Sequence, residues 1–255
     1  MKAEFSKVEA KGLFCTTKWS LIARSADIRT PESQIALAEL CTLYWYALYA
    51  FARRSGHDVH TAEDLTQGFF LHLLEHKTFD QVNRAKGRFR SFLLASFKHY
   101  MSVVWHRNHA AKRGGCEKIV SLDAENAEHR YGLEAVDDLT ADKVFEARWA
   151  ETLLARTTNR LRDDYIKAGK ERIFSRLQMF LLHAGSEEEN SYQSIAEEFG
   201  LTASGAKTLI FRLRKRFAAL LREEVANTLM DPADVESELH ALCEALLTAQ
   251  PASVD

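Results

Sequence analysis

The chain has 255 residues, 46% of them hydrophobic and 27% charged, so it can bury a core as one large domain or two modest ones. Its 11 glycines and 3 prolines fall well below the roughly 12% these residues average in proteins, which argues against turn-rich sandwiches and barrels and favours long helices. The net charge of −2, taken alone, argues against a nucleic-acid partner.

The sequence gives no sign of export, membrane insertion or disulfide bonding. Residues Met1–Phe14 mix Lys and Glu without an apolar stretch, unlike a secretory signal. The longest largely apolar run, Leu40–Ala52, is shorter than the roughly 18 residues that suggest a membrane span. The four cysteines are widely scattered, which makes a disulfide framework or a zinc finger improbable. We therefore expect a reduced, cytoplasmic chain with no membrane partner and no cofactor.

Apolar residues recur at steps of three and four along most of the chain, which predicts an all-α fold. In the first half, helices are expected at Ser33–Ser55, Ala62–His76 and Arg88–Lys112, the second of them opened by a capping box of Thr61 and Asp64. A linker is expected over residues 114–140. In the second half, helices are expected at Asp142–Ala168, Glu171–His183, Tyr192–Phe199 and Ala203–Val225. A last helix follows Asp231 at its N-cap and Pro232 in its first turn, with Val235, Leu239, Leu242 and Leu246 on its apolar side.

Charge is distributed very unevenly along these elements. Residues 84–118 carry nine Lys and Arg against one acid, and residues 200–222 carry six against none. Residues 223–255 carry eight acids and no Lys or Arg. The near-neutral total is therefore a cancellation between basic and acidic segments, and a nucleic-acid partner is possible after all.

Residues 191–217 have the pattern of a helix-turn-helix. Small Ala196 allows a close helix crossing, Gly200 suits a turn with positive φ, and Thr202 or Ser204 can cap the next helix. The apolar contacts between the two helices are expected from Ile195, Phe199, Leu201, Ala206 and Leu209. The second helix is expected to direct Ile210, Leu213, Phe217 and Leu220 inward, and Lys207, Arg212, Arg214, Lys215 and Arg216 outward. Such basic side chains meet phosphates and base edges, although a helical hairpin with a solvated basic side has the same charge pattern.

The basic segment 84–112 is interleaved with aromatic residues, a combination that single-strand binders use to stack bases and hold the backbone. At least two of Phe92, Phe97 and Tyr100 are expected to belong to the core instead. Trp105, beside His106, is expected to face the surface.

These segments together resemble the extracytoplasmic-function (ECF) group of bacterial RNA polymerase sigma factors. The resemblance is carried by Ala62–Phe70, by Gly87–Leu94 and by the helix-turn-helix Ser191–Arg216. Further motifs, among them Thr16–Ser20, Lys112–Gly115, Ser121–Ala124 and Asp231–Glu236, are similar to those of a planctomycete-like subgroup with a C-terminal extension.

The resemblance implies two helical domains joined by an acidic linker, with the following division of the chain. Residues 1–32 are an N-terminal extension, 33–113 a sigma region 2-like domain, 114–140 the linker, 141–225 a region 4-like domain and 226–255 an acidic helical extension. The implied function is to bind core RNA polymerase, through its clamp helices and flap, and to direct it to promoter DNA. A partner such as an anti-sigma factor is also compatible with this class. The chain is not expected to be an enzyme.

The resemblance also implies three sets of site residues. The −35 element is read by Ser204, Lys207, Thr208, Arg212, Lys215 and Arg216. The −10 element is opened by Arg88, Phe89, Arg90, Phe92, Trp105, Arg107 and Asn108. The polymerase clamp is bound by Asp64, Gln67 and Phe70. Gly68, His99, Val103 and Leu209 depart from the residues common in the family.

Two other readings of the sequence stay open. The helix-turn-helix alone is compatible with a transcription regulator that binds duplex DNA without polymerase. His72 and His76 form an H-x-x-E-H pattern, which would suit a zinc hydrolase but lacks a convincing third ligand. The acidic linker, including Glu128, either threads the RNA path of polymerase or is plainly solvated. The acidic terminal helix either binds back on the basic segments, restraining DNA binding, or meets a regulator.

Overall fold

The structure is a computed structural model that describes residues 31–75, 88–110, 124–133, 139–181, 188–229 and 231–249. Within these ranges the chain is helical and contains no strand, which confirms the all-α prediction. No helix among these residues is long and apolar enough to cross a membrane.

The first half of the chain contributes three helices to one core. Helix α2 runs over Pro31–Arg54, α3 over Val59–Glu75 and α4 over Phe89–Ala110. Their large aromatic side chains fill the space between them, with the rings of Phe69 and Phe97 5.1 Å apart. The helix ends lie within three residues of the predicted ends, because local periodicity and turn residues set them.

The start of α3 differs from the prediction. The expected capping box of Thr61 and Asp64 is wrong, since the helix begins earlier and Asp58 caps it. The Asp58 carboxylate accepts hydrogen bonds from the Thr61 amide at 2.9 Å and the Thr61 hydroxyl at 3.0 Å. These bonds lower the pKa of Asp58. The carboxylate of Asp64 is therefore not used as a cap.

Part of the predicted linker is folded. Helix α5, Ala124–Leu133, lies against α2, where Glu128 accepts hydrogen bonds from Arg53 Nη2 at 2.9 Å and Tyr49 Oη at 2.5 Å. Arg130 lies over the ring of Tyr46, 4.0 Å from its centroid. Glu128 is thus bound to α2 in this structure and is not part of an extended acidic linker. Its partner Arg53 lies 75 positions away in the sequence, so local pattern could not predict the contact.

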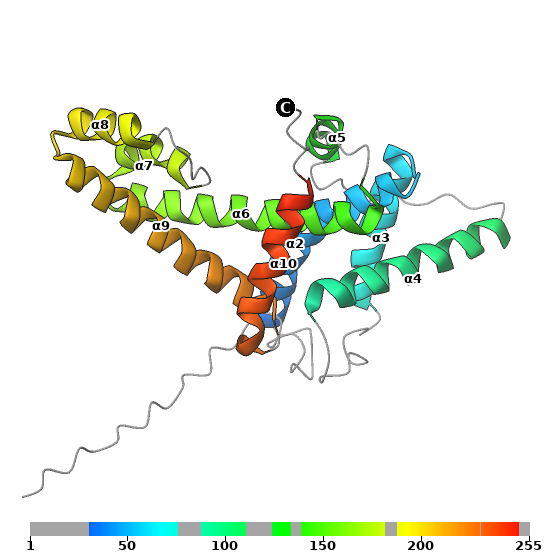
Figure 1. Ribbon diagram of the computed structural model, residues 1–255. Coiled ribbons are helices and arrows are strands. Elements are labelled where there is room, and N and C mark those ends of the chain that lie inside the picture. The colour runs from blue at the N-terminus through cyan, green and yellow to red at the C-terminus, as the bar shows by residue number, and fades with distance from the viewer. Residues whose placement is uncertain are drawn as a thin grey trace, which may run out of the picture.

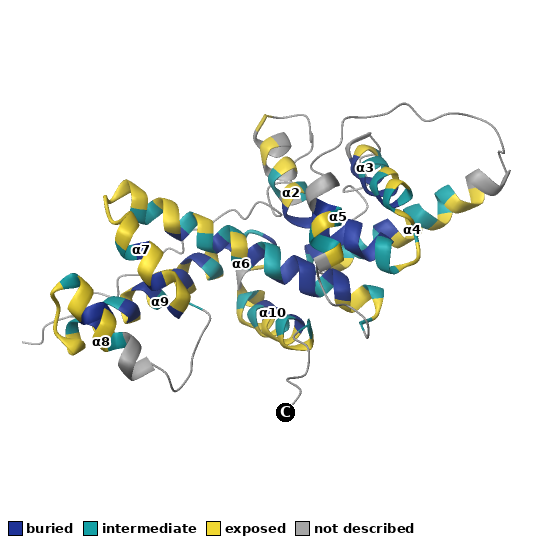
Figure 2. Ribbon diagram, turned by 90° about the horizontal axis from the view of Figure 1, so that it is seen from above, coloured by how far each residue is buried: buried dark blue, intermediate teal, exposed yellow. Residues whose placement is uncertain are grey.

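The long helix α6, Ala141–Lys167, passes through the centre of the molecule (Figure 1). Phe145, Trp149 and Leu153 in its first half are fully buried in the core of α2, α3 and α4. Leu161 in its second half belongs to a separate core. The predicted second domain, residues 141–225, includes all of α6, whereas the structure embeds the two halves of α6 in different cores. Figure 2 shows the resulting buried stripe along α6 and α2.

The second core is built on the far half of α6. It comprises α7 (Glu171–Leu177), the 3-10 turn η2 (Gln178–Phe180), α8 (Glu188–Phe199) and α9 (Ala203–Ala226). The chain ends with the 3-10 turn η3 (Pro232–Asp234) and α10 (Val235–Ala249). Helix α10 crosses α6 at mid-length (Figure 1) and adds Leu242 and Ala245 to the first core.

Candidate nucleic-acid interface

Helices α8 and α9 form the predicted helix-turn-helix. Gly200 joins them with a φ of +64°, a conformation that costs glycine little. Of the two candidate caps, Thr202 is used, and its hydroxyl accepts a hydrogen bond from the Gly205 amide at 3.1 Å. Ile195 and Ala206 are buried between the helices, as expected, whereas Leu201 stays 41% exposed. The local backbone and packing of the motif thus follow the sequence prediction, apart from Leu201.

The outer side of α9 carries most of the predicted −35 residues in positions open to solvent. They are exposed along its first four turns: Ser204, Lys207, Thr208, Arg212 and Lys215. The Lys207 ammonium lies 5.5 Å from the ring centroid of Tyr192 in α8, which steadies it at the start of the helix. The Thr208 hydroxyl donates a hydrogen bond to the Ser204 carbonyl at 2.9 Å.

Two of the arginines expected to point outward from α9 are engaged within the chain. Arg214 turns back and donates from Nε to the Phe180 carbonyl at 2.8 Å, so the outward prediction for it is wrong. Arg216 is exposed, but its guanidinium pairs with Asp164 of α6 at 2.7 Å. The basic surface available to DNA on α9 is therefore centred on Lys207, Arg212 and Lys215.

An aromatic residue that the sequence analysis did not single out lies in the middle of this surface. Phe211 is 66% exposed, the most exposed aromatic ring among the residues that the structure describes. It lies one helical turn from both Lys207 and Lys215. The sequence already indicated that Phe211 is exposed, because position 211 falls outside the apolar stripe that contains Ile210 and Leu213. An exposed ring among cations can contact the methyl group of thymine in a major groove.

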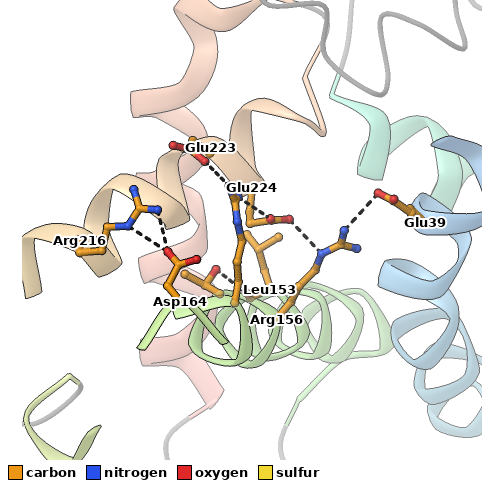
Figure 3. A network of polar contacts seen from close by, with 9 residues as sticks. Glu39, Leu153, Arg156, Asp164, Arg216, Glu223 and Glu224 are labelled. Atoms are coloured by element: carbon orange, nitrogen blue, oxygen red, sulfur yellow. Dashed lines mark hydrogen bonds and ion pairs between the residues drawn. The ribbon is translucent and has the colours of Figure 1, made fainter. Parts of the chain in front are cut away.

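A ladder of ion pairs fastens α9 to α6 and α6 to α2 (Figure 3). Arg156 of α6 reaches Glu39 of α2 at 3.2 Å and Glu224 of α9 at 3.0 Å. Arg160, one turn further, pairs with Glu223 at 2.6 Å and Glu224 at 3.0 Å. Burial lowers the pKa of Arg160, but the two glutamates outweigh it and raise the pKa. Helix α9 is thus fixed on α6 by its C-terminal half, while the inner side of its N-terminal half packs in the second core.

The predicted −10 residues at the start of α4 are enclosed by the protein in this structure. Phe89 is 2% exposed and its ring packs edge-on against Tyr44, while Phe92 is partly buried against the same core. Arg90 is 5% exposed and Arg88 is half-buried. These four residues therefore do not form an exposed DNA-binding surface in the chain as folded here. Helical periodicity predicts an exposed surface at this turn because it does not show that Tyr44 of α2 packs on Phe89 and that Glu238 of α10 pairs with Arg88 and Arg90.

The far end of α4 retains an exposed aromatic group. Trp105 is 53% exposed and its ring meets His106 edge-on at 4.9 Å, in line with the expectation that it faces the surface. Phe97 is fully buried and Tyr100 packs on the core, as expected for core aromatics. The side chains of Arg107 and Asn108 lie outside the described residues, although the backbone of both is in α4.

The predicted clamp-binding residues lie along α3. Asp64 is exposed, Gln67 is half-buried, and Phe70 lies mostly in the core at 9% exposure. Leu71, which the sequence analysis did not select, is 40% exposed one turn beyond Gln67 and extends this surface. Leu71 follows Asp64 by seven positions, which places both residues on the same side of the helix and could have been read from the sequence.

Gly68 lies where α3 comes closest to Tyr100 of α4. A β-carbon at this position would lie 2.5 Å from the Tyr100 hydroxyl of α4. Any larger side chain at position 68 would therefore meet the Tyr100 hydroxyl, and glycine permits this close approach.

The three candidate surfaces are spread over the molecule. Helices α8 and α9 lie toward one end of α6, and α3 and α4 toward the other (Figures 1 and 2). In the described part of the chain, no three His, Cys, Asp or Glu side chains gather where they could hold a metal. His72 stacks obliquely near Tyr100, and His76 lies outside the described residues.

No protein-family model matches this chain, and neither does any curated protein or solved structure.

Proposed function

We propose that this protein is a cytoplasmic sigma factor of the ECF type, which binds core RNA polymerase and directs it to promoters. In this proposal, residues 33–113 and 141–225 are the two promoter-binding modules. Helix α9 reads the −35 duplex, α4 engages the opened −10 strand, and α3 docks on the polymerase clamp. The enclosed turn of α4 must then become accessible in the complex with polymerase.

The observation that carries the proposal is the exposed basic side of α9 in a properly closed helix-turn-helix. Lys207, Arg212 and Lys215 project from a helix whose opposite side is packed in the second core. A recognition helix enters the major groove in this way, with cations and a small number of base-reading side chains outward. Exposed Asp64 and Leu71 on α3 supply a second, separate surface, for which a simple repressor has no need.

Reconstitution with core RNA polymerase tests the proposal. The chain should co-purify with core enzyme and support transcription from at least one fragment of the source genome. Asp64→Ala combined with Gln67→Ala should weaken binding to core enzyme while leaving duplex binding intact. A chain that neither binds core enzyme nor supports transcription from any fragment would refute the sigma assignment.

Salt dependence separates the contribution of α9. Lys207→Ala and Arg212→Ala should each weaken duplex binding and reduce the slope of log K against log salt by about 0.9, since each removes one phosphate contact. Lys143→Ala is the matched control, because Lys143 is exposed at the start of α6, in the other half of the molecule. An equal effect of all three substitutions would point to nonspecific attraction.

A regulator that binds duplex DNA without polymerase is the second candidate. It is favoured by one observation, namely that the −35-type surface is open in the isolated chain while Arg88 and Arg90 of α4 are engaged by other side chains. Specific binding to a genomic duplex, together with no affinity for core enzyme, would establish this function in place of the first.

A further inference from the structure

Four charged side chains meet where α10 crosses the first turn of α4. Glu238 of α10 accepts hydrogen bonds from Arg90 at 2.7 Å and 3.2 Å, and it pairs with Arg88 Nε at 2.9 Å. Ser237 accepts a hydrogen bond from Arg88 Nη2 at 3.2 Å. Arg90 also pairs with Glu146 of α6. The two arginines and two glutamates balance each other in charge.

Two members of this cluster, Glu238 and Arg90, are buried, unlike the ion pair that Glu236 of α10 makes. The side chain of Glu238 is 1% exposed and that of Arg90 is 6% exposed. The Arg90 guanidinium lies 4.7 Å from the ring centroid of the fully buried Trp149. By contrast, Glu236 of α10 pairs with Arg222 of α9 at 2.8 Å with both side chains more than half exposed. A buried carboxylate is tolerated only with such partners, so Glu238 fixes where α10 docks.

The apolar side of α10 seats it on the same surface. Leu242 and Ala245 are buried, and Val235, Leu239 and Leu246 pack against the first core. Docking therefore combines a modest apolar stripe with one buried carboxylate. Helix α10 contains three glutamates and no Lys or Arg, and it is held against the most basic part of the chain.

We propose that α10 is an intramolecular competitor of single-stranded DNA, which occupies Arg88 and Arg90 through Glu238. This inference rests on the proposed function. A guanidinium binds carboxylate and phosphate through the same fork of N–H donors, so one pair of arginines cannot serve both at once. The free chain then exposes its duplex-reading helix while its strand-binding arginines are covered. Release of α10 makes Arg88 and Arg90 available to a DNA backbone.

The test compares Glu238→Gln with Glu236→Gln in the full chain. Both substitutions remove one negative charge from α10, but only the first breaks the buried cluster. The probe is a fluorescently labelled single strand of deoxythymidylate, with binding followed by anisotropy over a range of NaCl concentrations. We expect the Glu238→Gln protein to bind the strand about tenfold more tightly than the unmodified chain. The reason is that the state in which α10 covers Arg88 and Arg90 no longer competes with the strand. The log–log salt slope of this variant should stay close to that of the unmodified chain, because Arg88 and Arg90 contact the same phosphates in both proteins once α10 is released.

Glu236→Gln should match the unmodified chain in both affinity and slope. Equal affinity of all three proteins would overturn the competition, and the proposed function would still stand if the unmodified chain supports transcription with core enzyme. Tighter binding by Glu238→Gln alone, from a chain that neither binds core enzyme nor supports transcription, would uphold the competition and refute the sigma assignment.

A second measurement needs no substitution and therefore does not depend on the folding of the variant. Hydrogen exchange of α10 is followed in the unmodified chain with and without saturating oligonucleotide. Competition requires the amides of α10 to exchange faster when the strand is bound. Unchanged protection of α10 at saturation would overturn the inference, whatever the variants do.

Discussion

The contact between Gly68 and Tyr100 gives a prediction whose sign depends on the structure. Glycine inside a helix costs about 1 kcal/mol relative to alanine, so helix propensity alone predicts that Gly68→Ala stabilises the chain. The new β-carbon, however, would lie 2.5 Å from the Tyr100 hydroxyl, 0.9 Å short of the 3.4 Å where ordinary contact begins. The Tyr100 ring is held by Phe69 and His72, with centroids 5.7 Å and 5.4 Å away.

The magnitude follows from the two opposing effects. Overpacking of a well-filled site costs about 1–3 kcal/mol, and the propensity gain returns about 1 kcal/mol. Gly68→Ala should therefore lower the free energy of unfolding by about 1 kcal/mol, or a few degrees in Tm. In a Tyr100→Phe background the clashing oxygen is gone, and the nearest remaining ring atom lies at 3.6 Å. There the same substitution should stabilise the chain by about 1 kcal/mol.

Urea denaturation of the four proteins in this double-mutant cycle measures both effects at once. The coupling energy between positions 68 and 100 should be about 1–3 kcal/mol, the cost of the overpacking itself. Stabilisation by Gly68→Ala in both backgrounds, with no coupling, would refute the reasoning and show that α3 and α4 approach less closely than described.

Three further predictions address the cap, the linker helix and the recognition surface. Thr202→Ala should cost about 1 kcal/mol in urea denaturation, because its hydroxyl caps α9, whereas Ser204→Ala should cost less; equal losses would contradict the cap. Burial raises the pKa of Glu128, but the hydrogen bonds from Arg53 outweigh it and hold the pKa below the ordinary 4.5. Docking of α5 should therefore hold above about pH 4.5 and weaken as the pH falls further, and hydrogen exchange of α5 should show the same loosening at neutral pH in Glu128→Gln. Phe211→Ala should weaken duplex binding about tenfold with no change in salt slope, since the ring carries no charge; a changed slope would contradict an apolar contact.

Local patterns in the sequence were sufficient for most of the helical framework. Periodicity located the inward stripe of α9, and Gly200 and Thr202 marked its start, because these signals depend only on neighbouring residues. The same kind of signal was present for Phe211 and Leu71, whose helical positions place them beside residues already selected. These two were missed because an apolar residue is normally assigned to the core.

Contacts between residues distant in the chain could not be predicted in this way. The burial of Arg90 depends on Glu238, which is 148 positions away, and the docking of α5 depends on Arg53, 75 positions from Glu128. Charge counts allow the acidic terminal helix to bind back on the basic segments, but they do not identify the residues that pair, because they record composition and not proximity. The sequence therefore predicts that Arg88 and Arg90 are suited to bind a DNA strand, but it does not predict that α10 covers them.

Helix α6 contains neither glycine nor proline between Ala141 and Lys167, so it has no built-in hinge over a length of about 40 Å. Its first half is wedged into one core by Trp149 and Leu153, and its second half into the other by Leu161. The two halves of the molecule are consequently expected to melt in a single cooperative transition. Any partner that draws them apart must either carry α6 away with one half or cover Trp149 and Leu153 with an apolar surface of its own.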